Sequence, residues 1–88
     1  MDVKDLKYFI AVYEAKGFSR ACDALGTVQS NVSTRIRSLE EFFGVPLFER
    51  RHRIVVPTAT GDRLYAHAKA VMESLELTER AVRLAAAA

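Results

Sequence analysis

The residues best placed to do chemistry lie in the stretch LGTVQSNVSTRIRSLE, residues 25–40. Val32, Ile36, Leu39 and Phe43 recur at spacings of four, three and four, so they share one helical face and need a core beneath them. The other face carries short or planar hydrogen-bonding groups in place of the usual Glu and Lys: Gln29, Ser30, Ser33, Thr34 and Arg37. Such side chains let a helix approach a groove of DNA closely, which makes base readout the first hypothesis.

Each of these polar groups has a plausible partner on DNA. Gln29 can pair its amide with adenine N6 and N7 in the major groove. Ser30, Ser33 and Thr34 can bond bases or phosphates, and Arg37, one turn beyond Ser33, can reach phosphate or guanine. From the helix alone, an ordinary solvated surface remains an alternative, because polar residues also cover surface helices and helix-turn-helix patterns have false positives.

The elements around this helix complete a recognisable arrangement. A first helix begins at Asp2 as N-cap and ends at Gly17, and a short second helix begins at Ser19. Gly26 and Thr27 interrupt the run, and Thr27 is the expected cap of the third helix, which continues to Phe43. Helix, tight glycine-containing turn and helix over residues 19–43 is typical of a helix-turn-helix, whose second helix enters the major groove.

A basic hairpin is expected after the third helix. The β-prone segments Val45–Glu49 and Ile54–Val56 flank the tetrapeptide RRHR, residues 50–53. We assign a minor-groove contact to Arg53 and backbone contacts to Arg50, Arg51 and His52, against the alternative of a solvated turn. Contacts with the DNA backbone are also assigned to three further residues: Arg20, Arg35 and Arg37. For Arg20 the alternative is an ion pair with Asp23, three residues on.

Pro57 and Thr58 end the hairpin and start a long last helix. Apolar or small residues alternate along it at spacings of four and three: Leu64, Ala68, Val71, Leu75, Thr78 and Val82. A stripe this narrow favours packing against another helix, so we assign these six residues to dimerisation. The predicted division is a winged helix-turn-helix domain over residues 1–57 and a linker and dimerisation helix over residues 58–88.

Composition limits the remaining possibilities. The net charge of +2 arises between residues 19 and 63, where seven Arg face five acidic residues. Half of the residues are hydrophobic, but no apolar run is long enough to span a membrane, so we expect a cytoplasmic protein. The single Cys22 is expected to be a small core residue, and neither His52 nor His67 has metal-ligand spacing. Adjacent Glu40 and Glu41 point apart on a helix, and the sequence has no Gly-rich phosphate loop or nucleophile motif, so we expect neither an enzyme nor a cofactor.

The run from Leu6 to Arg50, followed by PTATG, strongly resembles the N-terminal winged helix-turn-helix of LysR-type transcriptional regulators. The resemblance is most specific in QS-x-VS-x-x-I-x-x-LE, residues 29–40, and in G-V-x-LFER, residues 44–50. It implies a mainly α fold of three helices and a two-stranded wing, followed by a long helix. Many family members differ at four positions, where this chain has Val28, Thr34, Arg35 and Ile54, and these differences bear on sequence preference and wing shape.

The resemblance also implies partners. The third helix reads double-stranded DNA, the wing follows the backbone or minor groove, and the last helix joins two subunits, which makes a homodimer on an inverted repeat the expected assembly. A tetramer of the full-length protein stays open. A small-molecule inducer is expected to act through a C-terminal effector-binding domain outside these 88 residues. The competing hypotheses are a protein-interaction module whose working surface is the last helix, and another kind of winged-helix DNA binder.

Overall fold

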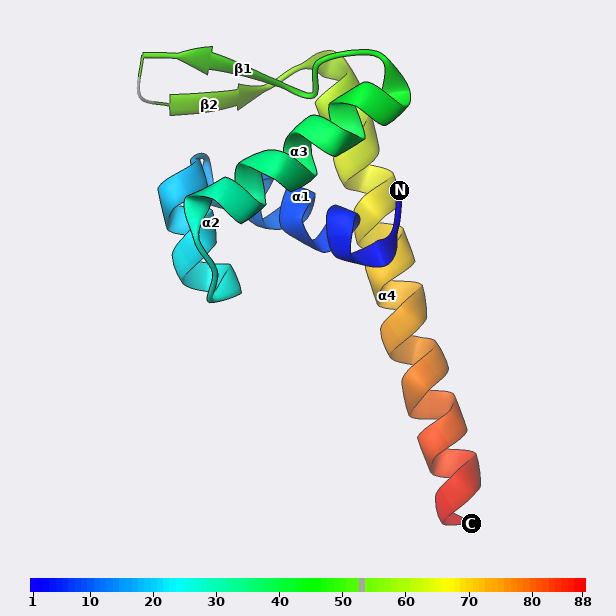
Figure 1. Ribbon diagram of the computed structural model, residues 1–88. Coiled ribbons are helices and arrows are strands. Elements are labelled where there is room, and N and C mark those ends of the chain that lie inside the picture. The colour runs from blue at the N-terminus through cyan, green and yellow to red at the C-terminus, as the bar shows by residue number, and fades with distance from the viewer. Residues whose placement is uncertain (53) are drawn as a thin grey trace.

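The computed structural model describes residues 1–52 and 54–88, which form four helices and one hairpin. The elements in chain order are α1 (Val3–Ala15), α2 (Phe18–Leu25), α3 (Gln29–Phe43), β1 (Phe48–Arg51), β2 (Ile54–Pro57) and α4 (Ala59–Ala87). Helices α1 to α3 pack together with the hairpin at one side, and α4 leaves this body and extends well beyond it (Figure 1). The predicted fold class, a winged helix-turn-helix followed by a long helix, is confirmed.

The core lies where α1, α2 and α3 meet the hairpin. The largest fully buried side chains come from α1, α3 and the turn before β1: Phe9, Val12, Val32, Leu39 and Leu47. Of the apolar face that the periodicity predicted, Val32, Ile36 and Leu39 are buried, but Phe43 at the end of α3 is 40% exposed, so its predicted burial is wrong. Because that face is held inward, the opposite face of α3 is turned toward solvent.

Three helix ends differ from the sequence predictions, namely the end of α1 and the starts of α2 and α3, whereas the start of α1 agrees. The side chain of Asp2 accepts a hydrogen bond from the Asp5 amide at 2.8 Å, which confirms it as the N-cap of α1. Lys16, and not Gly17, is the left-handed residue that ends α1, with φ of 58°. Gly17 is instead the N-cap of α2, so the expected Ser19 cap is wrong.

The expected cap of α3 is also wrong. Val28 occupies the N-cap position and has no side chain that could accept from the helix amides. The Thr27 hydroxyl oxygen accepts a hydrogen bond from the Asn31 side chain at 2.9 Å instead. The first turn of α3 therefore begins without a side-chain cap.

The hairpin begins later than predicted. Strand β1 starts at Phe48, because Val45–Leu47 form a turn held by Glu40, whose carboxylate accepts from the Leu47 amide at 2.7 Å. Arg50 and Arg51 thus lie on the strand, opposite Val55 and Ile54, and do not form the tip. His52, with φ of 58°, makes the turn.

Thr58 fixes the start of α4 against the same turn. Its hydroxyl accepts from the Gly61 amide at 3.0 Å and donates to the Pro46 carbonyl at 2.9 Å. Gly61 packs directly on the Leu47 carbonyl, where a Cβ would lie well inside contact distance of the oxygen. The absence of a side chain at residue 61 is what lets α4 begin this close to the body of the fold.

Candidate nucleic-acid interface

The exposed face of α3 carries the residues that the sequence assigned to base readout. Gln29, Ser30 and Thr34 are exposed, as is Arg37, while Ser33 is half-buried beside the hairpin. None of them is turned into the core. Because α3 has no side-chain cap, its first amides remain free of a side-chain acceptor, and a helix N-terminus of this kind favours an anion such as phosphate.

The hairpin stands beside this helix and brings one arginine next to it. The Arg50 guanidinium lies over the Phe18 ring, 4.5 Å from its centroid, in a cation–π contact. Two adjoining hollows lie around this pair, one reaching Gln29 and His52 and the other reaching Ser33 and Arg37. Gln29 and Ser33 therefore line adjoining hollows with Arg50, whereas Thr34 borders the hollow on the Arg35 side of α3.

The other predicted backbone contacts differ in their surroundings. Arg51 forms an exposed ion pair with Glu49 at 3.1 Å, and His52 is exposed at the turn. Arg20 is exposed on α2, and within residues 1–52 and 54–88 it forms no ion pair with Asp23. The minor-groove assignment of Arg53 falls outside the described residues.

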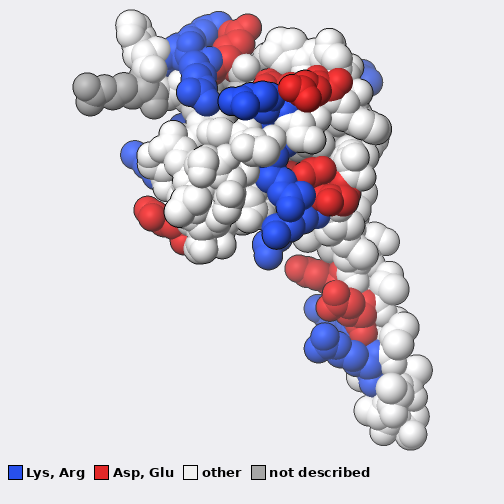
Figure 2. Space-filling model, viewed as in Figure 1, with Lys and Arg blue, Asp and Glu red and all other residues white. Residues whose placement is uncertain are grey.

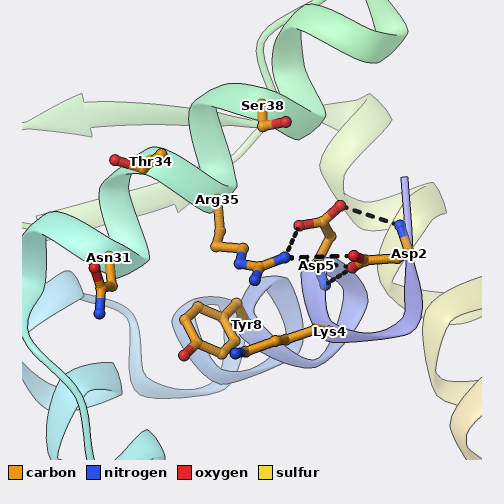
Figure 3. Close-up of a pocket in the computed structure, with 8 residues that line it drawn as sticks. All are labelled: Asp2, Lys4, Asp5, Tyr8, Asn31, Thr34, Arg35 and Ser38. Carbon is orange, nitrogen blue, oxygen red and sulfur yellow. Dashed lines mark hydrogen bonds and ion pairs between the residues drawn. The ribbon is translucent and has the colours of Figure 1, made fainter.

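Arg35 points the other way from the base-reading residues. Figure 3 shows its side chain reaching from α3 toward the start of α1, while Thr34 points away from that cluster. Its guanidinium lies 2.9 Å from Asp5, 3.5 Å from Asp2 and 5.6 Å from the Tyr8 ring centroid. The contacts with the two carboxylates all use Nη1, so the structure gives Arg35 a role in joining α3 to α1. The phosphate contact of Arg35 stays a prediction.

This cluster also sets the charge state of the α1 cap. The hydrogen bond from the Asp5 amide, helped by the charge of Arg35, lowers the pKa of Asp2 from its ordinary value of 3.8, although desolvation opposes the change. The hydrogen bond to Asp5 raises the pKa of Arg35. Both groups therefore remain charged at neutral pH.

Two residues at this surface escaped the sequence reasoning. Phe18 forms the floor between Gln29, Ser33 and Arg50, and Ser19 lines the hollow beside Gln29. The Phe18–Arg50 contact joins residues 32 positions apart, so no local pattern could reveal it. Ser19 lies in the first turn of α2, where its residue type predicts a helix cap and not a surface contact.

The dimerisation stripe of α4 divides into two parts. Leu64 packs against the core but is only half-buried, whereas Ala68 is 1% exposed and covered by its own chain. For Ala68 the predicted dimer contact is wrong, because no surface is left for a partner. Val71, Thr78 and Val82 are exposed and Leu75, like Leu64, is half-buried, so these five remain the predicted contact.

Charge and metal chemistry add two observations. Figure 2 shows basic side chains gathered along the hairpin and the neighbouring part of α3, with acidic ones beside them, and mixed charges along α4. Among residues 1–52 and 54–88, no three His, Cys, Asp or Glu residues are grouped as metal ligands. Cys22 is half-buried, somewhat more open than expected, and is unpaired.

Comparison with known proteins identifies the architecture. Residues 3–62 match the family described as bacterial regulatory helix-turn-helix protein, lysR family. The chain belongs to the LysR family. The LysR-family relatives include the Hca operon transcriptional activator HcaR of Escherichia coli K12, 42% identical over 76 residues, which are 86% of this chain and 26% of HcaR. YofA of Bacillus subtilis is 37% identical over 84 residues, 96% of this chain and 30% of YofA.

LysR-family structures superpose closely on this chain. A BenM DBD in complex with catB site 1 DNA has a TM-score of 0.96 and 32% identity, covering 100% of this chain and 99% of that one. A CbnR DBD in complex with DNA has a TM-score of 0.92 and 35% identity, covering 98% and 99%. The 88 residues span between a quarter and a third of the curated LysR-family relatives named above. Of the helices in the described residues, none combines the length and apolarity needed to cross a membrane.

Proposed function

We propose that this chain binds double-stranded DNA as a homodimer at an inverted repeat, with α3 in the major groove. The observation that carries the proposal is the exposed N-terminal face of α3, where Gln29, Ser30 and Thr34 stand clear of the core. Gln29 also lines a hollow with Arg50 and His52 of the basic hairpin. Short polar side chains leave the helix free to enter the groove, and Gln29 offers an amide for adenine. Neighbours of the same fold are complexes with DNA, which supports this assignment.

The hairpin supplies the second part of the interface. Arg50 is held over Phe18 and so is placed before DNA arrives, which reduces the rotamer entropy lost on binding. We assign it to a phosphate next to the groove that α3 occupies. We assign Arg51 and His52, farther along the hairpin, to contacts with the DNA backbone at the edge of the neighbouring minor groove.

The free part of α4 supplies the contact between two chains. Val71, Leu75, Thr78 and Val82 continue the stripe beyond the point where the chain covers it. An isologous contact between two such stripes relates the two recognition helices by a two-fold axis, and the DNA site then has the same symmetry. In the whole protein, a small-molecule signal would act through an effector-binding domain.

Selection of bound sequences from a random DNA pool tests the proposal. We expect enrichment of two half-sites in inverted orientation, spaced by about one helical turn or a multiple of it. A matched selection with the double variant Gln29→Ala, Ser33→Ala should recover the inverted arrangement poorly or with altered bases. If no sequence is enriched and the affinity for DNA stays in the nonspecific range of roughly 10⁻⁴ to 10⁻⁶ M, the result favours the protein-interaction hypothesis instead.

A further inference from the structure

Two reciprocal hydrogen bonds join α1 to the beginning of α4. The Tyr13 hydroxyl on α1 donates to Asp62 Oδ1 on α4 at 2.7 Å. The Tyr65 hydroxyl on α4 donates to Glu14 Oε2 on α1 at 2.6 Å. The two tyrosine rings stack between these bonds, with centroids 3.8 Å apart and planes within 6° of parallel. We call Tyr13, Glu14, Asp62 and Tyr65 the tyrosine clamp.

The clamp fixes the angle between α1 and α4 as well as adding contact area between them. Each helix contributes one hydroxyl donor and one carboxylate acceptor, so a change in the angle between α1 and α4 lengthens at least one bond. Hydrogen bonds from a hydroxyl to a carboxylate are short and stronger than neutral ones. They also raise the pKa of both tyrosines, which keeps each hydroxyl in its donating form. Lys69 adds an ion pair to Glu14 at 3.5 Å.

The clamp lies at the base of a lever. Beyond Lys69, the side-chain hydrogen bonds and ion pairs of α4 within the described residues stay inside the helix, from Thr78 to Ser74 and from Arg83 to Glu79. Residues 70–87 of α4 project from the fold, as Figure 1 shows, and cover about 27 Å at 1.5 Å per residue. A small tilt at the clamp therefore becomes a large displacement at the dimer stripe.

We propose that the tyrosine clamp sets the spacing between the two half-sites that a dimer of this chain recognises. The inference rests on the proposed function, because it requires two chains joined through α4. A tilt of about 5° over a lever of about 27 Å moves its end by about 2.4 Å, and two protomers double this displacement. The result exceeds the 3.4 Å rise of one base pair. No clamp residue lies on α3 or the hairpin, so the base preference of each half-site is independent of the clamp.

The test measures spacing preference apart from base preference. The inverted half-sites that the chain selects are placed in a DNA pool with spacers that differ by one base pair. The wild-type chain is compared with the double variant Tyr13→Phe, Tyr65→Phe, which keeps the stacked rings and removes both donors. Tyr8→Phe is the matched control, because Tyr8 lies on α1 but faces Arg35 and not α4.

The expected result is a broadened spacing profile. The double variant should lose the preference for the best spacing over its neighbours by about fivefold or more, as removal of directional hydrogen bonds predicts. Its selected half-site bases should match those of the wild type and of Tyr8→Phe. The double variant Glu14→Gln, Asp62→Asn, which weakens the same bonds from the acceptor side, should broaden the profile too. Circular dichroism of each variant shows that it is folded.

The outcomes separate the two proposals. A double variant with the same sharp spacing profile as the wild type overturns the role of the clamp and leaves DNA binding intact. A change in half-site bases, with unchanged spacing, overturns it as well. A wild-type chain that enriches no inverted half-sites overturns the proposed function itself, and the clamp inference falls with it.

Discussion

Gln29 stands at the first position of α3, exposed and next to the hollow that also contains Arg50. Replacement by alanine removes a paired donor and acceptor without disturbing the core. We expect Gln29→Ala to lose about 1 to 3 kcal/mol on the selected site and to relax base preference at one position per half-site. Titration of labelled DNA with every base at that position measures both effects. Ser38→Ala, on the flank of α3 that faces the Arg35 cluster, is the control. Equal weakening on random DNA would contradict a base contact.

Arg50 and Arg51 are neighbours in sequence but differ in what holds them. Arg50 lies over the Phe18 ring, whereas Arg51 is already paired with Glu49. We expect Arg50→Ala to lower affinity for all sequences and to reduce the salt slope by about one unit, since one phosphate contact is lost. Arg51→Ala should change the slope less, because its charge is partly compensated. Binding measured over a series of salt concentrations decides this, and an unchanged slope for Arg50→Ala would rule out its phosphate contact.

The cap of α1 links the stability of an element to pH. Because the folded chain lowers the pKa of Asp2 below 3.8, the ionised carboxylate favours folding. Its contribution is present above pH 3.8 and is lost as the pH falls through the lowered value. Asn caps helices well and does not titrate, so Asp2→Asn should lose less stability on acidification. Urea unfolding of both proteins between about pH 5 and about pH 2 measures the difference. If the free energy of unfolding changes with pH in the same way for both proteins, the stabilising role of the ionised Asp2 cap is contradicted.

The beginning of α4 depends on one small residue. Alanine favours a helix interior over glycine by about 1 kcal/mol, so helix propensity alone predicts that Gly61→Ala is stabilising. The new Cβ would however meet the backbone carbonyl of Leu47, which cannot rotate away as a side chain could. Overpacking of this kind costs about 1 to 3 kcal/mol, so we expect net destabilisation, measured by thermal unfolding. A rise in the midpoint temperature of unfolding would show that the turn before β1 shifts to make room for the new Cβ.

Elements that depend on contacts between residues near in sequence could be predicted, whereas features that depend on contacts between distant residues could not. Apolar periodicity places α1, α3 and α4, because each buries one face and the core residues Val32, Ile36 and Leu39 report it directly. Helix ends are less predictable, since Lys16 adopts the left-handed conformation next to a glycine better suited to it. Strand β1 also starts later than the sequence predicts, because Glu40 accepts from the amides of Leu47 and Phe48, seven and eight residues away, and holds the chain before the strand as a turn.

The candidate site shows the same limit at longer range. The exposed face of α3 was predictable, since the buried face determines it. The placement of Arg35 was not, because its partners Asp2 and Asp5 lie 33 and 30 residues away on another helix. Ala68 fits the heptad stripe in sequence but is covered by its own chain. Periodicity shows that a face is buried without showing which neighbour buries it.

At the scale of the whole molecule, the elongated shape separates the proposed DNA-binding surface from the proposed contact between protomers. The chain measures 54 × 25 × 18 Å, and its length comes from α4, which extends away from the body that carries α3 and the hairpin (Figure 1). Under the proposed function, a single protomer presents one recognition helix and therefore binds one half-site. Affinity for a full site then depends on two half-sites being engaged at once, which raises the effective concentration of the second contact. In the proposed homodimer, joining two protomers is accordingly the step on which specific binding depends most.

Val71 tests that step because it lies in the stripe and is 40% exposed in the single chain. Val71→Asp places a charge in the proposed contact between two protomers, where no partner charge compensates it, while the fold of each chain survives. We expect monomers in sedimentation velocity and DNA affinity that falls toward the nonspecific range of roughly 10⁻⁴ to 10⁻⁶ M. Ala70→Asp, one residue earlier and exposed off the stripe, adds the same charge and should leave the dimer intact. Dimers that persist with Val71→Asp would place the contact between protomers elsewhere on the chain.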